Sequence, residues 1–302
     1  MRPSLSLLAK LAGAGTTGVA ALLAFRRLQR DSAVASLRRE VRDAALLLSQ
    51  SNSSAAPPPA VLVAGFRAQG KSSLVNTACR ALGGEAGPLL LRSETAPPGS
   101  GAGTVARQVV RATVAADEKG EEEREEDAVV EMVDAPPLPG AAELTRLDVE
   151  VAIGGEVAPE CVVLVLRCGG PAKERKMAVR KLPDIAGVIR ERGLHLVVVL
   201  THKKAIKTLR QAEELRREVS FRARTDSVYF IENYTPSNTL DIRHPQCIKN
   251  DFDTHFTVLT IIRQCLEFVK LYRHATRATR VSIRPPLPNG QIFNSKAFKL
   301  MI

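Results

Sequence analysis

The stretch from residue 60 to residue 76 constrains the fold more than any other part of the chain. The run AVLVA at residues 60–64 is apolar and rich in β-branched side chains, which predicts a buried strand. It leads into GFRAQGKS at residues 65–72, and a helix-like pattern follows. This is the GxxxxGK(S/T) pattern in its strand–loop–helix context. It predicts a loop whose backbone N–H groups surround a phosphate chain.

Three side chains are expected to carry the chemistry of such a site. Lys71 is expected to contact the β- and γ-phosphates of a nucleotide, and the Ser72 hydroxyl to ligate Mg²⁺. Asp134 ends a second strand-like run at residues 128–134 and is expected to hold Mg²⁺ through water. The alternatives are a glycine-containing turn without a ligand and an aspartate that caps a turn before two prolines.

The rest of the chain alternates between buried runs and helical periodicity, which predicts a mainly parallel sheet with helices on both faces, a three-layer α/β/α fold. Ligands of such sheets bind at the carboxyl ends of the strands. Predicted strands occupy residues 105–115, 161–167, 194–200 and 227–231, and predicted helices occupy residues 72–82, 172–192 with an interruption near Pro183, 205–224 and 256–272.

Composition narrows the classes of partner. The formal net charge is +11, but aromatic residues make up 4% of the chain and Trp is absent, so stacking residues do not interleave with the basic ones. Nucleic-acid binding is therefore not expected. An anionic membrane surface would suit the basic N-terminal part. The five cysteines have no metal-ligand spacing, which predicts buried, reduced thiols.

Residues 1–30 contain basic and no acidic residues, with an uncharged run at residues 11–25. With residues 5–9 this run reaches about the 20 residues that a bilayer-spanning helix needs. One interpretation is an anchor in the mitochondrial outer membrane or endoplasmic reticulum, with Arg26, Arg27 and Arg30 holding the domain in the cytosol. The alternatives are a mitochondrial presequence and a helix packed on a soluble cytoplasmic protein.

The sequence thus divides into four predicted segments. Residues 1–30 are the anchor or targeting segment, and residues 31–59 are an amphipathic helix followed by a Ser/Pro linker. Residues 60–273 are the nucleotide-binding domain. Residues 274–302 are a basic tail without sustained periodicity.

The order of these elements resembles the P-loop GTPases. GFRAQGKSSLVN at residues 65–76 looks like their first nucleotide-binding element, and the SSLxN continuation is frequent in dynamin-like and related large GTPases. The TH dipeptide at residues 201–202 and FIENYT at residues 230–235 are most similar to the immunity-associated and interferon-induced 44-like GTPases. The resemblance covers about residues 60–272.

This resemblance implies a site for GTP or GDP with Mg²⁺. Thr104, or else Thr95, stands where these families place the loop threonine that completes Mg²⁺ coordination, although both can equally be ordinary loop hydroxyls. The implied catalytic candidates are Lys71, Arg67 and Thr104, and the implied metal ligands are Ser72, Thr104 and Asp134. The implied nucleotide-binding residues are Gly65, Phe66, Arg67, Ala68, Gln69, Gly70, Lys71, Ser72, Ser73, Thr201, His202, Lys204, Glu232 and Asn233.

Several positions depart from the family pattern. Pro137 stands where a glycine N–H usually contacts the γ-phosphate, and proline has no N–H. Lys204 stands where an aspartate usually accepts hydrogen bonds from guanine, which a cation cannot do. His202 replaces a lysine and is expected either to pack beside the base or to cap the strand. Arg67 is expected either to act as an arginine finger or to contact solvent or phosphate.

These observations predict a membrane-anchored, GTP-binding switch with slow hydrolysis or none. The resemblance also allows dimerisation through the nucleotide face. One alternative is a degenerate GTPase fold that serves as a scaffold, favoured by Pro137 and Lys204. The other is an ATP-binding P-loop protein, allowed by the absence of the guanine-reading aspartate. The sequence does not identify an effector.

Overall fold

A single mixed sheet organises the part of the chain that the computed structural model describes, residues 5–50, 56–95, 106–116, 127–235 and 249–282. The strands run in the order β2-β3-β1-β4-β5-β6; β2 is antiparallel to β3, and the other neighbours are parallel. Their bounds are β1 Ala60–Gly65, β2 Gln108–Thr113, β3 Val129–Asp134, β4 Cys161–Arg167, β5 His195–Thr201 and β6 Val228–Phe230. The predicted α/β fold with a mainly parallel sheet is confirmed.

The two faces of the sheet bury separate apolar cores because successive side chains of a strand point to opposite sides. In β1, Val61 and Val63 belong to one core, and Leu62 and Ala64 belong to the other. All six β1 residues are buried, as expected of a strand covered on both faces. The buried strand is what fixes the start of the loop that follows it.

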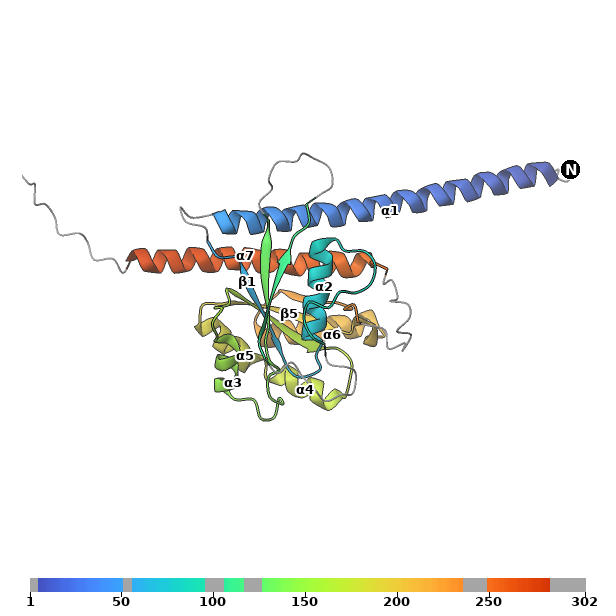
Figure 1. Cartoon of the computed structure of the whole chain (residues 1–302). Helices are drawn as coiled ribbons and strands as arrows, with labels where there is room; N and C mark the ends of the chain where they lie inside the picture. Colours follow the sequence, from blue (N-terminus) through green and yellow to red (C-terminus); the bar gives the residue numbers. More distant parts are fainter. Residues whose placement is uncertain (1–4, 51–55, 96–105, 117–126, 236–248, 283–302) are drawn as a thin grey trace, which may run out of the picture.

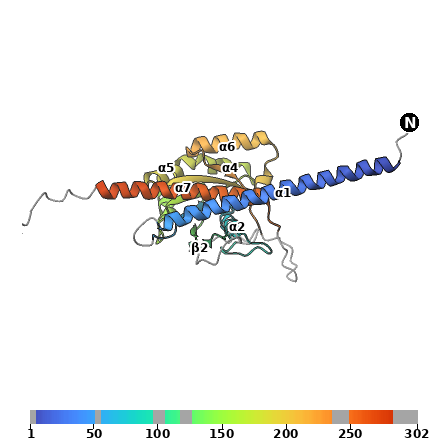
Figure 2. The ribbon, with the colours of Figure 1, turned by 90° about the horizontal axis from the view of Figure 1, so that it is seen from above.

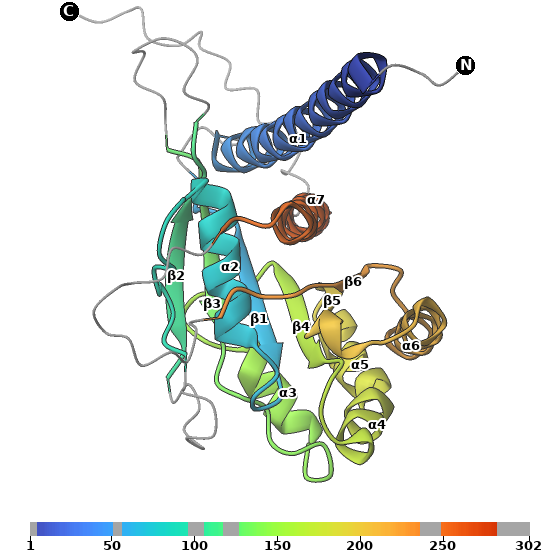
Figure 3. The ribbon, with the colours of Figure 1, turned by 90° about the vertical axis from the view of Figure 1, so that its right-hand side faces the viewer.

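Helices cover both faces, as Figure 3 shows with the sheet seen edge-on. The first core is closed by α1, α2 and α7, and the second by α3, α4, α5 and α6. Their bounds are α1 Leu5–Gln50, α2 Lys71–Gly83, α3 Arg146–Ile153, α4 Ala172–Arg180, α5 Leu182–Glu191, α6 Leu209–Ala223 and α7 Phe252–Ser282. The three-layer prediction and the interruption of the helix near Pro183 are therefore correct.

The N-terminal helix α1 differs from the prediction of two segments. It continues without a break through residue 30, and its second half packs on α7 while the first half extends beyond the domain (Figure 2). Leu37, Val41, Ala45 and Leu48 are buried in the first core, so this half belongs to the domain. Among the described helices, none is both long and apolar enough to span a bilayer, so the predicted transmembrane segment is not supported.

The last helix is longer than the predicted 256–272, because α7 runs from Phe252 to Ser282 and so passes the proposed domain boundary at residue 273. Arg273 lies within this helix and makes an ion pair with Glu160 at 2.6 Å. The same guanidinium donates to the carbonyl oxygens of Leu48 and Pro57. It thus joins the end of α1, the segment before β1 and the residue before β4.

The sequence missed α3, which begins with a capping box formed by Thr145 and Asp148. Thr104, the segment 117–126 and the tail beyond residue 282 lie outside the described residues. Four cysteines are free and buried, as predicted, namely Cys79, Cys161, Cys168 and Cys265.

Candidate phosphate-binding site

The loop between β1 and α2 has the backbone geometry that a phosphate site requires. Gly70 has φ 87° at the start of α2, and no side chain caps the helix. The N–H groups of a first helical turn have no partner within the helix, so they can bind an anion. Lys71 and Ser72, which open the helix, are 6% and 9% exposed. Ser73 follows in the same turn, and its carbonyl accepts a bond from the Thr77 hydroxyl.

Gly65 is required at the end of β1. Its φ is 152°, and a Cβ at this position would lie 2.5 Å from the carbonyl oxygen of Val165 in β4. Such an approach is far closer than carbon and oxygen tolerate, so a larger residue would push β1 and β4 apart. Ala68 has φ 56°, a left-handed conformation that few non-glycine residues adopt. The loop therefore holds a defined and partly strained path.

Side chains from β5 and the segment after β6 orient this loop. The Thr201 hydroxyl donates to the carbonyl of Gln69 at 2.7 Å, and the Asn233 amide donates to the carbonyl of Gly70 at 3.1 Å. Both carbonyl oxygens are thereby held toward the sheet edge. Thr201 and Asn233, predicted as nucleotide-binding residues, are placed at the loop by the structure.

Lys71 lies over the loop that it belongs to. Its ammonium group donates to the carbonyl of Phe66 at 3.1 Å. Burial lowers the pKa of Lys71 to about 8, although the nearby Asp134 carboxylate opposes this shift. Burial of a cation is unfavourable, so an incoming phosphate would relieve this cost.

Asp134 meets this group at the end of β3, as predicted. The side chain is 0% exposed, and one oxygen, Oδ2, accepts a bond from the Ser93 hydroxyl at 2.6 Å. The other oxygen, Oδ1, is buried without a hydrogen-bond partner among the described residues. A buried carboxylate oxygen without a donor fits the acceptor of a Mg²⁺-bound water. Ser72 and Asp134 therefore fit a Mg²⁺ site, with phosphate oxygens as the remaining ligands.

The end of the site where a base would lie is more exposed. His202 has φ 57°, and its Nδ1 lies 3.0 Å from the Thr201 hydroxyl. Burial, with a smaller effect of Arg167, lowers the pKa of His202. The Glu232 carboxylate accepts the backbone N–H of Lys204 at 2.9 Å and so links the ends of β5 and β6. Lys204 is exposed, and its ammonium group stands at the base end where a carboxylate would accept hydrogen bonds from guanine.

The segment after Asp134 offers no N–H group for a γ-phosphate at residue 137. Pro137 lacks the group, and the next N–H, that of Leu138, already donates to the carbonyl of Gly65 at 3.0 Å. Phe66 and Leu138 form an isolated parallel bridge. Gly140 lies further on at an exposed position and lines a cavity beside the loop.

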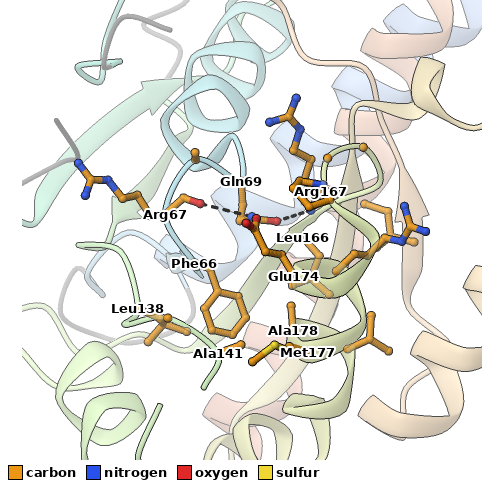
Figure 4. Close-up of a pocket in the computed structure, with 18 of the residues that line it drawn as sticks. Phe66, Arg67, Gln69, Leu138, Ala141, Leu166, Arg167, Glu174, Met177 and Ala178 are labelled. Atoms are coloured by element: carbon orange, nitrogen blue, oxygen red, sulfur yellow. Dashed lines mark hydrogen bonds between the residues drawn. The ribbon is translucent and has the colours of Figure 1, made fainter. Parts of the chain in front are cut away.

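An apolar cavity of about 410 Å³ lies beside the loop, between it and α4. Its walls include Phe66, Leu138, Leu166 and Ala178, and Figure 4 shows the Gln69 amide between Arg67 and Arg167. Gln69 Oε1 accepts the N–H of Arg167 at 2.6 Å. The cavity borders the loop directly, because Arg67, Ala68 and Gln69 also line it, and Arg167 and Arg175 lie on its far side. The exposed Arg67 side chain is directed away from it (Figure 4).

Sequence reasoning missed two residues beside Asp134. Ser93 and Asn76 bring the segment before β2 against the site. The hydroxyl that contacts Asp134 is that of Ser93 and not the predicted Thr95, and Thr104 lies outside the described residues. Asn76 belongs to the SSLxN sequence, which was the one available signal. A loop hydroxyl such as Ser93 follows no periodicity, so only the folded structure identifies it.

The fold and the site are consistent with an α/β P-loop nucleotide-binding protein. No protein-family profile matches the chain, and no curated protein matches it in sequence. A solved structure, the signal recognition particle receptor SRb-GTP/SRX complex from Chaetomium thermophilum, is similar with a TM-score of 0.36 and 13% identity. The match covers 59% of this chain and 90% of that one. The resemblance to interferon-induced 44-like, immunity-associated or dynamin-like GTPases is unconfirmed.

Proposed function

We propose that the protein binds guanine nucleotides with Mg²⁺ and acts as a P-loop GTPase-type switch. The observation that carries this proposal is the convergence of the uncapped start of α2, the buried Lys71 ammonium and the unpartnered oxygen of Asp134. The N–H groups and the lysine bind the phosphates, and Asp134 orients water toward the metal. Mg²⁺, when bound through Ser72, neutralises charge on the β- and γ-phosphates.

Hydrolysis is proposed to be slow or absent. Residue 137 gives no N–H group to a γ-phosphate, and the N–H of Leu138 is engaged by Gly65. Hydrogen-bond donors at the transferred phosphoryl group account for much of the rate in such enzymes. Arg67 is exposed and available to contact the γ-phosphate, either as an arginine finger or by simple charge pairing.

Two alternative functions depend on the base end. Lys204 cannot accept hydrogen bonds from guanine, so an ATP-binding protein is the first alternative. A scaffold that uses the fold without a nucleotide is the second. The phosphate end favours a nucleotide-binding protein over the scaffold, because Asp134 Oδ1 lacks a partner that a Mg²⁺–nucleotide would supply and the Lys71 ammonium is buried with a depressed pKa.

The test is a titration of the full chain with fluorescent GTP, GDP and ATP, with and without Mg²⁺. We expect Mg²⁺-dependent binding of GTP and GDP that falls at least about 100-fold in Lys71→Ala, because a charged contact to each of two phosphates is lost. Lys203→Ala, an exposed lysine at the same edge, is the control and should bind as the wild type does. Preference for ATP would support the first alternative, and absence of all binding the second.

We also propose that the first half of α1 attaches the protein to an anionic membrane surface, with the domain facing the cytosol. Four large apolar side chains of this half are exposed beside three arginines: Leu22, Leu23, Phe25 and Leu28 with Arg26, Arg27 and Arg30. A basic helix with such apolar surface suits the lipid interface. The mitochondrial outer membrane and the endoplasmic reticulum remain the proposed locations.

Flotation with phosphatidylcholine vesicles, with and without phosphatidylserine, tests this attachment. The wild type should float only with the phosphatidylserine vesicles, and the double variant Leu22→Glu/Phe25→Glu should lose most of that binding. Leu47→Glu is the matched control, because Leu47 is an exposed leucine on the half of α1 that packs on the domain. Imaging of the chain with and without residues 1–30 would identify the membrane. Failure of the wild type to float would contradict the proposal.

A further inference from the structure

Ser93 lies in the segment between α2 and β2 and contacts the proposed Mg²⁺ site from outside the loop. It is 1% exposed, and its hydroxyl lies 2.6 Å from Asp134 Oδ2 and 3.1 Å from Gln108 Oε1. A hydroxyl has one proton to donate. The shorter distance and the negative charge of a carboxylate assign that proton to Asp134.

The side chain of Asn76 fixes the position of Ser93. Asn76 Oδ1 accepts the backbone N–H groups of Arg92 and Ser93 at 2.7 and 2.8 Å, and its Nδ2 donates to the Ser93 carbonyl at 2.9 Å. Asn76 is 1% exposed and lies four residues after Ser72 on α2, so both side chains are on one face of that helix. The helix that carries the proposed metal ligand therefore also holds Ser93.

A second contact secures the segment from the side of β2. Gln108 Oε1, at the start of that strand, accepts the backbone N–H of Glu94 at 3.2 Å. The Ser93 hydroxyl is thus held between α2 and β2 by bonds to three successive residues. These bonds hold the backbone that carries Ser93, and the hydroxyl itself contacts Asp134 and Gln108.

We propose that Ser93 is a positioning residue for Asp134: it binds one carboxylate oxygen and directs the other, Oδ1, toward Mg²⁺-bound water. This inference depends on the proposed nucleotide function. A carboxylate can rotate about its Cβ–Cγ bond, and the single donor at Oδ2 removes that freedom. The unpartnered Oδ1 is then the atom presented to the metal-bound water. Segment 88–95 is coupled to the metal through the same contact.

The experiment compares release of N-methylanthraniloyl-GDP from the full chain in excess Mg²⁺ and in EDTA. Loss of an outer hydrogen bond to a metal-linked carboxylate typically weakens metal affinity by roughly 10- to 100-fold. We therefore expect Ser93→Ala to raise the Mg²⁺ concentration for half-maximal retention at least about tenfold, with an unchanged release rate in EDTA. Ser93→Cys, which has the same shape and a weak donor, should resemble Ser93→Ala.

Ser220→Ala is the matched control, because its hydroxyl also donates one 2.7 Å bond, to Thr225, but far from the loop. It should leave the Mg²⁺ dependence unchanged. The chain has no Trp, so Leu91→Trp, at an exposed position of the segment, gives a single reporter. Its emission should change when Mg²⁺ is added to the nucleotide complex, and this change should disappear in the Ser93→Ala background.

The outcomes separate this inference from the function on which it depends. Equal weakening by Ser93→Ala with and without Mg²⁺ would show a purely structural role and overturn the inference alone. No effect of Ser93→Ala on Mg²⁺ dependence would also overturn it. Failure of the wild type to bind the probe in any condition would overturn the proposed nucleotide function and this inference together.

Discussion

The phosphate end and the base end of the candidate site are built in different ways. At the phosphate end the participating groups are buried: Lys71, Ser72, Asp134 and Ser93 are each at most 9% exposed. At the base end Lys204 is exposed and His202 and Glu232 are partly exposed. The first end follows the sequence pattern of the P-loop, and the second departs from it at Lys204.

The difference has a physical origin. Phosphate binding depends on backbone N–H groups at a helix start, and their placement depends on β1 and α2, which are part of the core. Recognition of a base depends on side chains of two surface segments, where a substitution costs little folding energy. Phosphate binding can therefore be argued from the fold, whereas base preference needs direct measurement.

Gly65→Ala should have the largest effect, because it alters the core that supports the phosphate end. The new Cβ would meet the Val165 carbonyl at 2.5 Å, so we expect the free energy of unfolding to fall by more than about 3 kcal/mol. Urea denaturation measures it. Gly187→Ala is the control: nothing lies within 4 Å of the new Cβ in α5, so it should stabilise by up to about 1 kcal/mol.

A carboxylate at residue 204 should change the base end without affecting the phosphate end. In Lys204→Asp we expect the ratio of GTP to ATP affinity to rise roughly tenfold, equivalent to one hydrogen bond to a charged group of about 1.5 kcal/mol. Lys203→Asp is the control for the change of charge and should leave the ratio unchanged. An unchanged ratio in Lys204→Asp would mean that residue 204 does not face the base.

Thr201→Val tests the connection between the two ends. It keeps the side-chain shape and removes the 2.7 Å bond to the Gln69 carbonyl, which should lower the free energy of unfolding by about 1 kcal/mol. Thr276→Val is the control: it removes a local bond to the Tyr272 carbonyl on α7 and should change the free energy of unfolding by less than about 0.5 kcal/mol. Equal effects of the two variants would indicate that Thr201 does not support the loop.

The smallest expected effect is proton uptake on nucleotide binding, which reports the protonation of Lys71 directly. The pKa of Lys71 is about 8 in the free protein, and phosphate should raise it toward the ordinary value, so binding at pH 8 should take up about half a proton. Affinity should then fall as the pH rises above 8. Calorimetry in buffers of different ionisation enthalpy measures the uptake. Lys71→Arg, always protonated, should show none from this residue.

The buried strands could be predicted from the sequence because they are covered on both faces. Runs such as residues 161–167 leave no polar face, so their apolar character is unambiguous. The short helix α3 was missed because Leu147 and Val151, which are exposed, blur its periodicity. Its signal was the Thr145 capping box rather than the apolar pattern.

The extents of α1 and α7 could not be predicted, because the amino-acid composition changes within each helix although the helical backbone continues. The charges at residues 26–31 suggested the end of an anchor, but no Gly or Pro interrupts residues 19–50, and the helix runs through. Likewise no breaker follows Tyr272 before Pro285. In the site, Ser93 could not be predicted because its contact with Asp134 joins residues 41 positions apart.

Because α1 is one unbroken helix, it would fix the distance and orientation of the domain relative to any surface that the start of the helix binds. At 1.5 Å per residue, residues 5–29 extend about 40 Å beyond the domain, and Arg30 contacts α7 at Phe252. A helix is stiff, whereas a Ser/Pro-rich linker at that place would allow the domain to rotate freely. The domain would therefore stand at a set height and tilt, with the candidate phosphate site in a fixed orientation relative to that surface.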